Sequence, residues 1–202
     1  MASQFALDAG FDGVEIHAAN GYLIDQFLRD GTNHRTDTYG GSLENRTRLL
    51  LEVTAAIITV WGAERVGVRL SPISPANDIL DSDPATLFTY VVEQLNPFGL
   101  LYLHLIEGDT GGARQVENGF DLQILRRLFN GIYIGNNGYD RELAVTARQQ
   151  GLVDLVAFGR LFISNPDLVE RLQRAAPLNK LDTDTLYGGG AKGYIDYPFL
   201  SK

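Results

Sequence analysis

The feature that most constrains the fold is an alternation of short apolar runs with longer segments of helical periodicity. Continuous apolar runs rich in β-branched residues are typical of parallel strands buried on both faces of a sheet. The distance between successive runs leaves room for a crossover helix after each strand. The predicted strands are Gly13–Ile16, Val66–Leu70, Leu100–Leu105, Ile132–Gly135 and Leu155–Phe158.

Helix start and stop signals lie between these runs. Ser42 precedes an apolar stripe that continues to Trp61, and Gly62 follows it, which predicts a capped helix with a defined end. Residues 2–9 have the pattern of the end of another helix. The remaining predicted helices begin after Asp83, Asp121, Asp140 and Asn165, and the last of them runs through Arg174.

Five β/α units are consistent with two architectures. An open, doubly wound sheet accommodates five strands, whereas a closed (β/α)₈ (TIM) barrel needs three more units. No linker or low-complexity segment divides the chain, so we predict one domain over residues 1–202. Within it, residues 176–202 have no periodicity and are predicted to form an irregular C-terminal loop and tail.

Composition excludes several classes of function. The net charge of -8 argues against binding to nucleic acid or to an anionic membrane surface, because both require concentrated positive potential. The chain has no cysteine, which excludes disulfides, thiolate nucleophiles and cysteine-ligated metals, and we predict no metal site. No signal peptide or membrane-spanning run is visible, and we expect a cytoplasmic protein.

The segment after the first predicted strand carries the first candidate site. His17 and Asn20 are two donors a short loop apart, and Tyr22 adds a phenol. Two neutral donors that converge on one oxygen stabilise negative charge that develops there, and a nearby phenol delivers a proton. A purely structural hydrogen-bond network remains the alternative for these three residues.

Charged residues inside the next two strands are the second signal. Arg69 lies among apolar neighbours, so it needs either an anionic ligand or a structural salt bridge. His104 is interpreted as a core histidine without a role, and Glu107 as a residue near the mouth of the site.

Glycine-containing turns follow the last two predicted strands. The first turn contains Asn136, Asn137 and Gly138, and the second contains Gly159 and Arg160. Backbone N–H groups in such turns, supplemented by an arginine, form phosphate sites in β/α proteins. We therefore predict that these five residues bind a phosphate group.

Five sequence motifs carry a resemblance to a known family. HxxNGYLxxQFL is followed by NxRTDxYGGSxENR, and YIGNNGYDRELA, LVAFGRxFIxNPDLVxRL and LYGGGAKGYxDYP occur later in the chain. This string resembles the Old Yellow Enzyme family of FMN-dependent ene reductases. The resemblance covers approximately residues 9–200 and implies the C-terminal portion of a (β/α)₈ barrel whose first three strands are missing.

The resemblance also implies roles for the candidate residues. Arg69 would lie beside the flavin, and Asn136, Asn137, Gly138, Gly159 and Arg160 would hold the phosphate of FMN. His17 and Asn20 would bind the carbonyl or nitro oxygen of an activated alkene, Tyr22 would protonate its α-carbon, and Tyr187 would lie near the site mouth. NADPH or NADH would serve as reductant.

Two alternatives remain open beside a complete ene reductase. The chain could be a catalytically inactive half-barrel that at most binds phosphate or FMN weakly, or a different phosphate-binding β/α enzyme. An arc of five strands leaves two sheet edges unpaired, so we expect a second chain to cover them.

Overall fold

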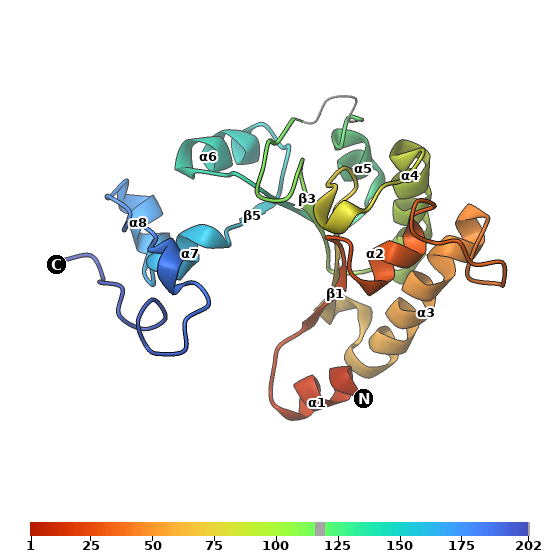
Figure 1. Cartoon of the computed structure of the whole chain (residues 1–202), viewed down its shortest axis with the longest axis horizontal. Helices are drawn as coiled ribbons and strands as arrows, with labels where there is room; N and C mark the ends of the chain where they lie inside the picture. Colours follow the sequence, from red (N-terminus) through yellow and green to blue (C-terminus); the bar gives the residue numbers. More distant parts are fainter. Residues whose placement is uncertain (116–119, 202) are drawn as a thin grey trace.

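The strand order distinguishes between the two architectures. The computed structural model describes residues 1–115 and 120–201 (Figure 1), and these form a five-stranded sheet in the order β1-β2-β3-β4-β5 with every neighbouring pair parallel. Each crossover therefore leads to the adjacent position, as in a (β/α)₈ barrel, whereas the order of a doubly wound sheet reverses at its centre. The strands are β1 (Val14–Ala18), β2 (Val66–Leu70), β3 (Tyr102–Ile106), β4 (Ile132–Asn136) and β5 (Leu155–Ala157).

The helices follow the strands along the outer side of this partial barrel. Figure 1 shows α3 to α6 arranged along the convex side of the sheet, while α7 and α8 lie beyond β5. Short 3₁₀ turns occur at Ala63–Arg65, Ala76–Asp78, Asn96–Phe98 and Thr183–Thr185. The helices are α1 (Ala2–Asp8), α2 (Leu23–Leu28), α3 (Leu43–Trp61), α4 (Pro84–Leu95), α5 (Gln123–Leu128), α6 (Arg141–Gln149), α7 (Arg160–Ser164) and α8 (Leu168–Arg174).

The last predicted helix start is wrong by two residues. The helix was expected directly after Asn165, but α8 begins at Leu168. The side chain of Asn165 donates to the carbonyl oxygen of Leu161 at 2.8 Å and accepts from the backbone N–H of Asn179 at 2.7 Å. Asn165 therefore terminates α7, a helix that the sequence pattern did not predict, instead of starting α8.

The two faces of the sheet differ in chemistry because side chains alternate along each strand. Val68, Leu103 and Tyr133 are fully buried and belong to the hydrophobic cluster that packs under the helices. The opposite, concave face carries polar side chains, and register places His17 beside Arg69 and Arg69 beside His104. The concave face therefore carries the polar side chains of the candidate site.

Two strands form the edges of the described sheet. β1 pairs only with β2 and β5 only with β4 among the described residues. Near the β5 edge, Leu155 is 51% exposed and Ile132 is 37% exposed, although both lie on strands. Exposed apolar side chains at a sheet edge are a contact surface for further polypeptide.

No helix in the described ranges is both long and apolar enough to cross a membrane.

Candidate functional site

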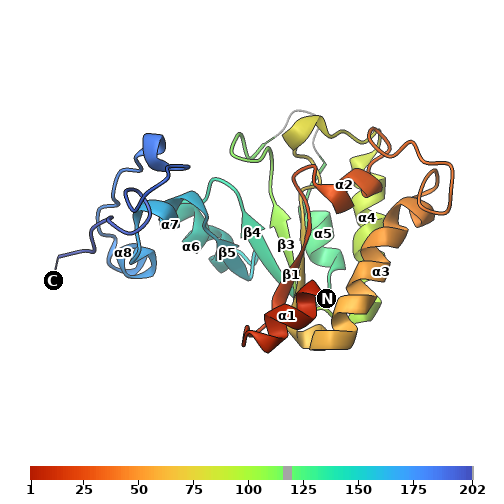
Figure 2. The same cartoon turned by 60° about the horizontal axis from the view of Figure 1, so that its bottom comes forward.

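The loops after the strands converge at one end of the sheet. In Figure 2 the loops that follow β1, β2 and β3 lie together at the top of the molecule, and the N-terminus lies at the opposite end. Parallel strands place their carboxyl ends on one side, so residues far apart in sequence meet there. All three predicted clusters, around His17, Arg69 and Arg160, belong to this end or to the concave face below it.

His17 and Tyr22 lie next to each other. Their ring centroids are 5.3 Å apart, and the phenol of Tyr22 belongs to a side chain that is 56% exposed. The side-chain oxygen of Asn20 accepts a hydrogen bond from Thr110 Oγ1 at 2.8 Å. Because the amide oxygen is already bonded, the NH₂ group of Asn20 is the part that donates to a ligand oxygen. His17 and Tyr22 thus lie together, and Asn20 offers its NH₂ group from the same segment after β1.

The environment of His17 favours the neutral imidazole. Desolvation by the surrounding protein and the positive charge of Arg69 hold the pKa of His17 below its usual value of 6.5. Glu15 and Asp25 act in the opposite direction but do not reverse the shift. At neutral pH His17 therefore donates a hydrogen bond from one ring nitrogen without carrying charge.

Replacement of Arg69 by methionine should raise the pKa of His17, because it removes the nearby charge that disfavours the imidazolium. An NMR titration measures this shift directly, and His34 in the same spectrum is the internal control. Since the folded wild-type chain binds this proton less tightly than the unfolded chain does, His17 lowers stability as the pH falls below 6.5. An unchanged or lower pKa of His17 in Arg69→Met would contradict this assignment.

Arg69 is bonded to an amide of the predicted phosphate turn. Its Nη2 donates to Asn136 Oδ1 at 2.9 Å, and Asn136 Nδ2 donates to the carbonyl oxygen of Ala157 at 2.8 Å. Within the described residues Arg69 Nε is buried and has no hydrogen-bond partner. A buried N–H of a cation without a partner suits an oxygen or anionic acceptor supplied by a ligand.

A cavity of about 440 Å³ lies next to this pair. The turns after β4 and β5 and the loop after β3 line it, and the cationic side chain of Arg160 is exposed at its wall. All five residues predicted to hold a phosphate border the cavity, namely Asn136, Asn137, Gly138, Gly159 and Arg160. The arrangement offers backbone N–H groups and one positive charge to an anion.

The side chain of Asn137 forms hydrogen bonds to the loop after β3. Its Nδ2 donates to the carbonyl oxygens of Glu107 at 2.9 Å and Asp109 at 2.8 Å, and its Oδ1 accepts from the N–H of Gly111 at 3.3 Å. Asn137 therefore anchors the loop after β3 against the turn after β4. Its backbone, with a φ of 101°, remains part of the cavity wall.

The loop after β3 also contributes to the site, although no motif in the sequence was assigned to it. Thr110 bonds to Asn20 and also lines the cavity, so it joins the two halves of the site. A Cβ on Gly111 would lie 2.3 Å from Arg160 Nη2, which shows how closely the guanidinium approaches this backbone. The glycine-rich string from Gly108 to Gly112 directly after a strand was the signal that could have revealed this loop.

Three other predicted positions have different environments. Glu107 is 6% exposed and accepts hydrogen bonds from buried groups, so its prediction as a residue of the open mouth is wrong. His104 is buried and its Nδ1 lies 2.8 Å from Glu15 Oε2, but it lies on the concave face beside Arg69 and not in the hydrophobic cluster under the helices. Tyr187 is 98% exposed on the C-terminal tail.

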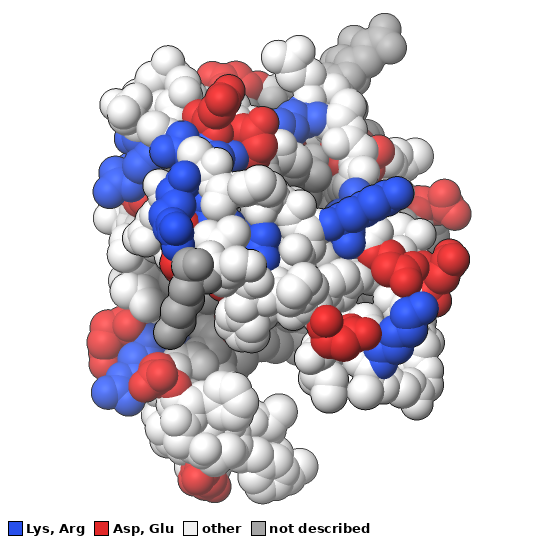
Figure 3. All heavy atoms as spheres, turned by 90° about the vertical axis from the view of Figure 1, so that its left-hand side faces the viewer, with Lys and Arg blue, Asp and Glu red and all other residues white. Residues whose placement is uncertain are grey.

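Charge on the surface is mixed. On the face shown in Figure 3, Lys and Arg side chains lie among Asp and Glu side chains and do not form one continuous basic area. Over residues 1–115 and 120–201, no group of three or more histidine, aspartate or glutamate side chains has a metal-binding arrangement. The candidate site consists of His17, Asn20 and Tyr22, the half-buried Arg69, and the cavity beside it.

Known proteins are similar to this chain in sequence and in fold. The model of the NADH:flavin oxidoreductase / NADH oxidase family matches residues 1–179. The chain is 50% identical over 207 residues to putative 12-oxophytodienoate reductase 5 of Oryza sativa subsp. japonica, covering 100% of the chain and 55% of that protein. It is 49% identical to 12-oxophytodienoate reductase 1 of the same organism, covering 54% of it.

Solved structures of similar proteins superpose closely on this chain. Morphinone reductase superposes with a TM-score of 0.93 at 48% identity, covering 98% of this chain and 53% of that one. The old yellow enzyme homologue from Zymomonas mobilis superposes with a TM-score of 0.93 at 44% identity, covering 98% of this chain and 56% of that one. The chain thus spans about half the length of the relatives it matches.

Proposed function

Because the chain belongs to the NADH:flavin oxidoreductase / NADH oxidase family, we propose that it binds FMN and takes part in the NAD(P)H-dependent reduction of activated alkenes such as enones and nitro compounds. The observation that carries this proposal is that hydrogen bonds link the candidate phosphate cavity to the candidate substrate donors at one end of the sheet. Asn136 bonds to Arg69 and lines the cavity with Arg160, while Thr110 connects that cavity to Asn20.

The residues of the cavity fit an FMN phosphate. Arg160 supplies charge, and the turns at Gly138 and Gly159 supply backbone N–H groups with no side chain in the way. Arg69 offers a buried N–H that has no partner among the residues the structure describes, which suits the oxygen or nitrogen acceptors of a flavin ring. When bound, the flavin supplies hydride transfer, which no side chain of this chain can perform.

The protein's own residues orient and polarise the substrate. His17 and the NH₂ group of Asn20 donate to the carbonyl or nitro oxygen and stabilise the charge that develops there. Tyr22 donates its phenolic proton to the α-carbon. Tyr187 lies on the exposed tail. We assign it to the mouth of the site, which it would reach when the tail packs against substrate or further polypeptide.

A second candidate is an inactive half-barrel, and the exposed sheet edges favour it. Leu155 and Ile132 leave apolar surface near β5 open, so the flavin site would lack the walls that further β/α units provide. In this case the chain binds phosphate or FMN weakly without turnover, unless a second chain covers the edges.

The test is a titration of the purified chain with FMN, followed by fluorescence. We expect saturable binding that Arg160→Ala weakens by about tenfold or more, because a charged hydrogen bond to phosphate is lost. Arg127→Ala removes an exposed arginine of α5 and is the control. Oxidation of NADPH and of NADH with 2-cyclohexenone then measures turnover, and light scattering measures whether copies associate.

The outcomes separate the two candidates. Bound yellow flavin with turnover supports the reductase. Colourless protein that binds inorganic phosphate through Arg160, without nicotinamide oxidation, supports the inactive half-barrel.

A further inference from the structure

The loop that carries Asn20 and Tyr22 has an unusual backbone. It joins β1 to α2, and Asn20 and Gly21 have φ angles of 58° and 72°, so two successive residues are left-handed. A non-glycine residue adopts this conformation at a cost unless local contacts hold it there. A Cβ on Gly21 would lie 2.5 Å from the carbonyl oxygen of Ala76, so the loop also packs closely against the segment after β2.

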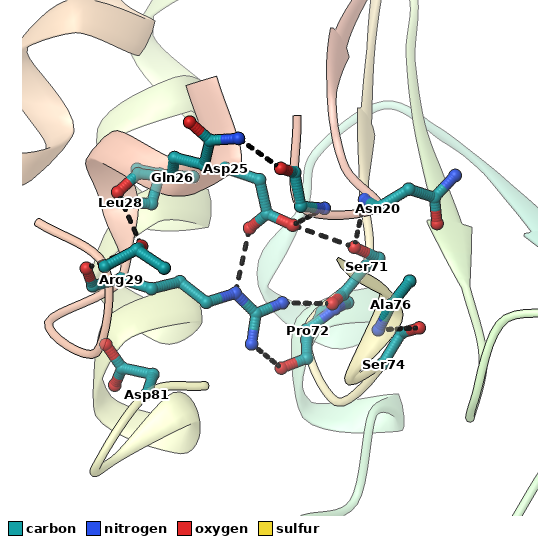
Figure 4. A network of polar contacts seen from close by, with 12 residues as sticks. Asn20, Asp25, Gln26, Leu28, Arg29, Ser71, Pro72, Ser74, Ala76 and Asp81 are labelled. Atoms are coloured by element: carbon teal, nitrogen blue, oxygen red, sulfur yellow. Dashed lines mark hydrogen bonds and ion pairs between the residues drawn. The ribbon is translucent and has the colours of Figure 1, made fainter. Parts of the chain in front are cut away.

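One carboxylate oxygen accepts the backbone N–H of one left-handed residue directly and is linked to the N–H of the other through a serine hydroxyl. The N–H of Gly21 donates to Asp25 Oδ2 at 2.9 Å. The N–H of Asn20 donates to Ser71 Oγ at 2.7 Å, and the Ser71 hydroxyl donates to the same Oδ2 at 3.2 Å. Figure 4 shows these contacts converging on the carboxylate from the loop between β1 and α2 and from the segment after β2.

A buried cation fixes the carboxylate in turn. Arg29 Nε donates to Asp25 Oδ1 at 2.9 Å, and the two side chains are 3% and 0% exposed. The remaining nitrogens of Arg29 donate to the backbone carbonyl oxygens of Ser71 and Pro72. Every oxygen of Asp25 therefore has a partner, and the ion pair links α2 to the segment that contributes Ser71 (Figure 4).

We propose that Asp25 is a positioning residue that sets the orientation of Asn20 and Tyr22 toward the substrate oxygen and α-carbon, directly through Gly21 and indirectly through Ser71. The role of the two side chains toward substrate rests on the function proposed above. The role of Asp25 in shaping the loop rests only on the contacts in this chain. Asp25 itself does not touch the substrate.

The experiment is amide hydrogen exchange of the full chain, resolved at Asn20 and Gly21. In Ser71→Ala the Asn20 amide should exchange about tenfold faster because it loses one hydrogen bond, while Gly21 keeps its direct bond to Asp25. In Asp25→Asn both amides should exchange faster. Ser71→Ala leaves the Asp25–Arg29 pair in place, so it remains informative if Asp25→Asn fails to fold.

Two matched variants control for general loss of stability. Thr54→Val removes a fully buried hydroxyl from α3, and Asp167→Asn breaks the buried i,i+4 ion pair with Arg171 at α8. Both should leave exchange at Asn20 and Gly21 unchanged relative to the rest of the chain. If either control speeds these amides as much as Ser71→Ala does, or if Ser71→Ala leaves Asn20 protected, the proposal is overturned.

Binding of 2-cyclohexenone to the FMN-loaded chain tests the link to substrate. Ser71→Ala should weaken binding by roughly tenfold, the effect of a misplaced hydrogen-bond donor, and Thr54→Val should not change it. If exchange responds to Ser71→Ala as expected but the wild-type chain binds no enone, the function proposed above is overturned. The positioning of the loop by Asp25 is still supported in that case.

Discussion

Glu107→Ala is expected to lower the free energy of unfolding by about 3–5 kcal/mol, the usual consequence of removing one partner from a buried charged network. Glu107 accepts hydrogen bonds from the hydroxyls of Tyr133 at 3.1 Å and Tyr139 at 2.6 Å, and from Arg114 at 2.7 Å. Tyr133 is fully buried, so its hydroxyl would lose its acceptor where water cannot replace it. Denaturant unfolding followed by circular dichroism measures the change.

The matched control is Glu52→Ala. Glu52 also accepts a hydrogen bond from a tyrosine hydroxyl, that of Tyr39 at 2.9 Å, but this pair is exposed to solvent. Water replaces the lost contact there, so the midpoint of unfolding should scarcely move. Equal losses in the two variants would show that burial of Glu107 adds nothing to the stability of the chain.

The same network makes stability depend on alkaline pH. Burial raises the pKa of Tyr139, and the hydrogen bond to Glu107 raises it further, so the folded chain keeps this phenol neutral where the unfolded chain ionises it. The stabilisation is complete below the ordinary tyrosine pKa of 10.0 and is lost as the pH rises above it.

The strands and the two glycine-containing turns could be predicted because their signals are local. Continuous apolar runs located the five strands to within about two residues, and each glycine-containing turn directly follows its strand. The strand order could not be derived from these runs, because five parallel strands fit either an open sheet or part of a barrel. The resemblance supplied that distinction, and the pairing of β1 through β5 in chain order confirms it.

The remaining contacts depend on residues far apart in the sequence. His104 and Glu15 are separated by 89 positions, and Asn20 and Thr110 by 90. No periodicity within one segment encodes such a contact, because it arises only when the strands assemble. The same holds for Glu107, whose position at a strand end suggested the open site although its partners come from the buried side of β4 and the turn after it.

Tyr22→Phe should lower kcat for 2-cyclohexenone by about 10²-fold or more in the FMN-loaded chain, the usual contribution of a positioned general acid. The ring is retained, and with it the packing against His17 at a centroid distance of 5.3 Å. Because the variant keeps both residues proposed to bind the substrate oxygen, His17 and Asn20, KM should change little. Loss of kcat at constant KM is the signature of a group that acts only in the transition state.

Tyr90→Phe provides the control, since it removes a phenol from α4 that lies outside the site. Tyr22 is 56% exposed, so water is the competing proton source, and the two sources predict different results. If water protonates the α-carbon, Tyr22→Phe keeps wild-type kcat, and the assignment of Tyr22 fails. If Tyr22 is the donor, kcat falls in this variant alone, and a proton from solvent then reaches the carbon only slowly because no side chain orients it.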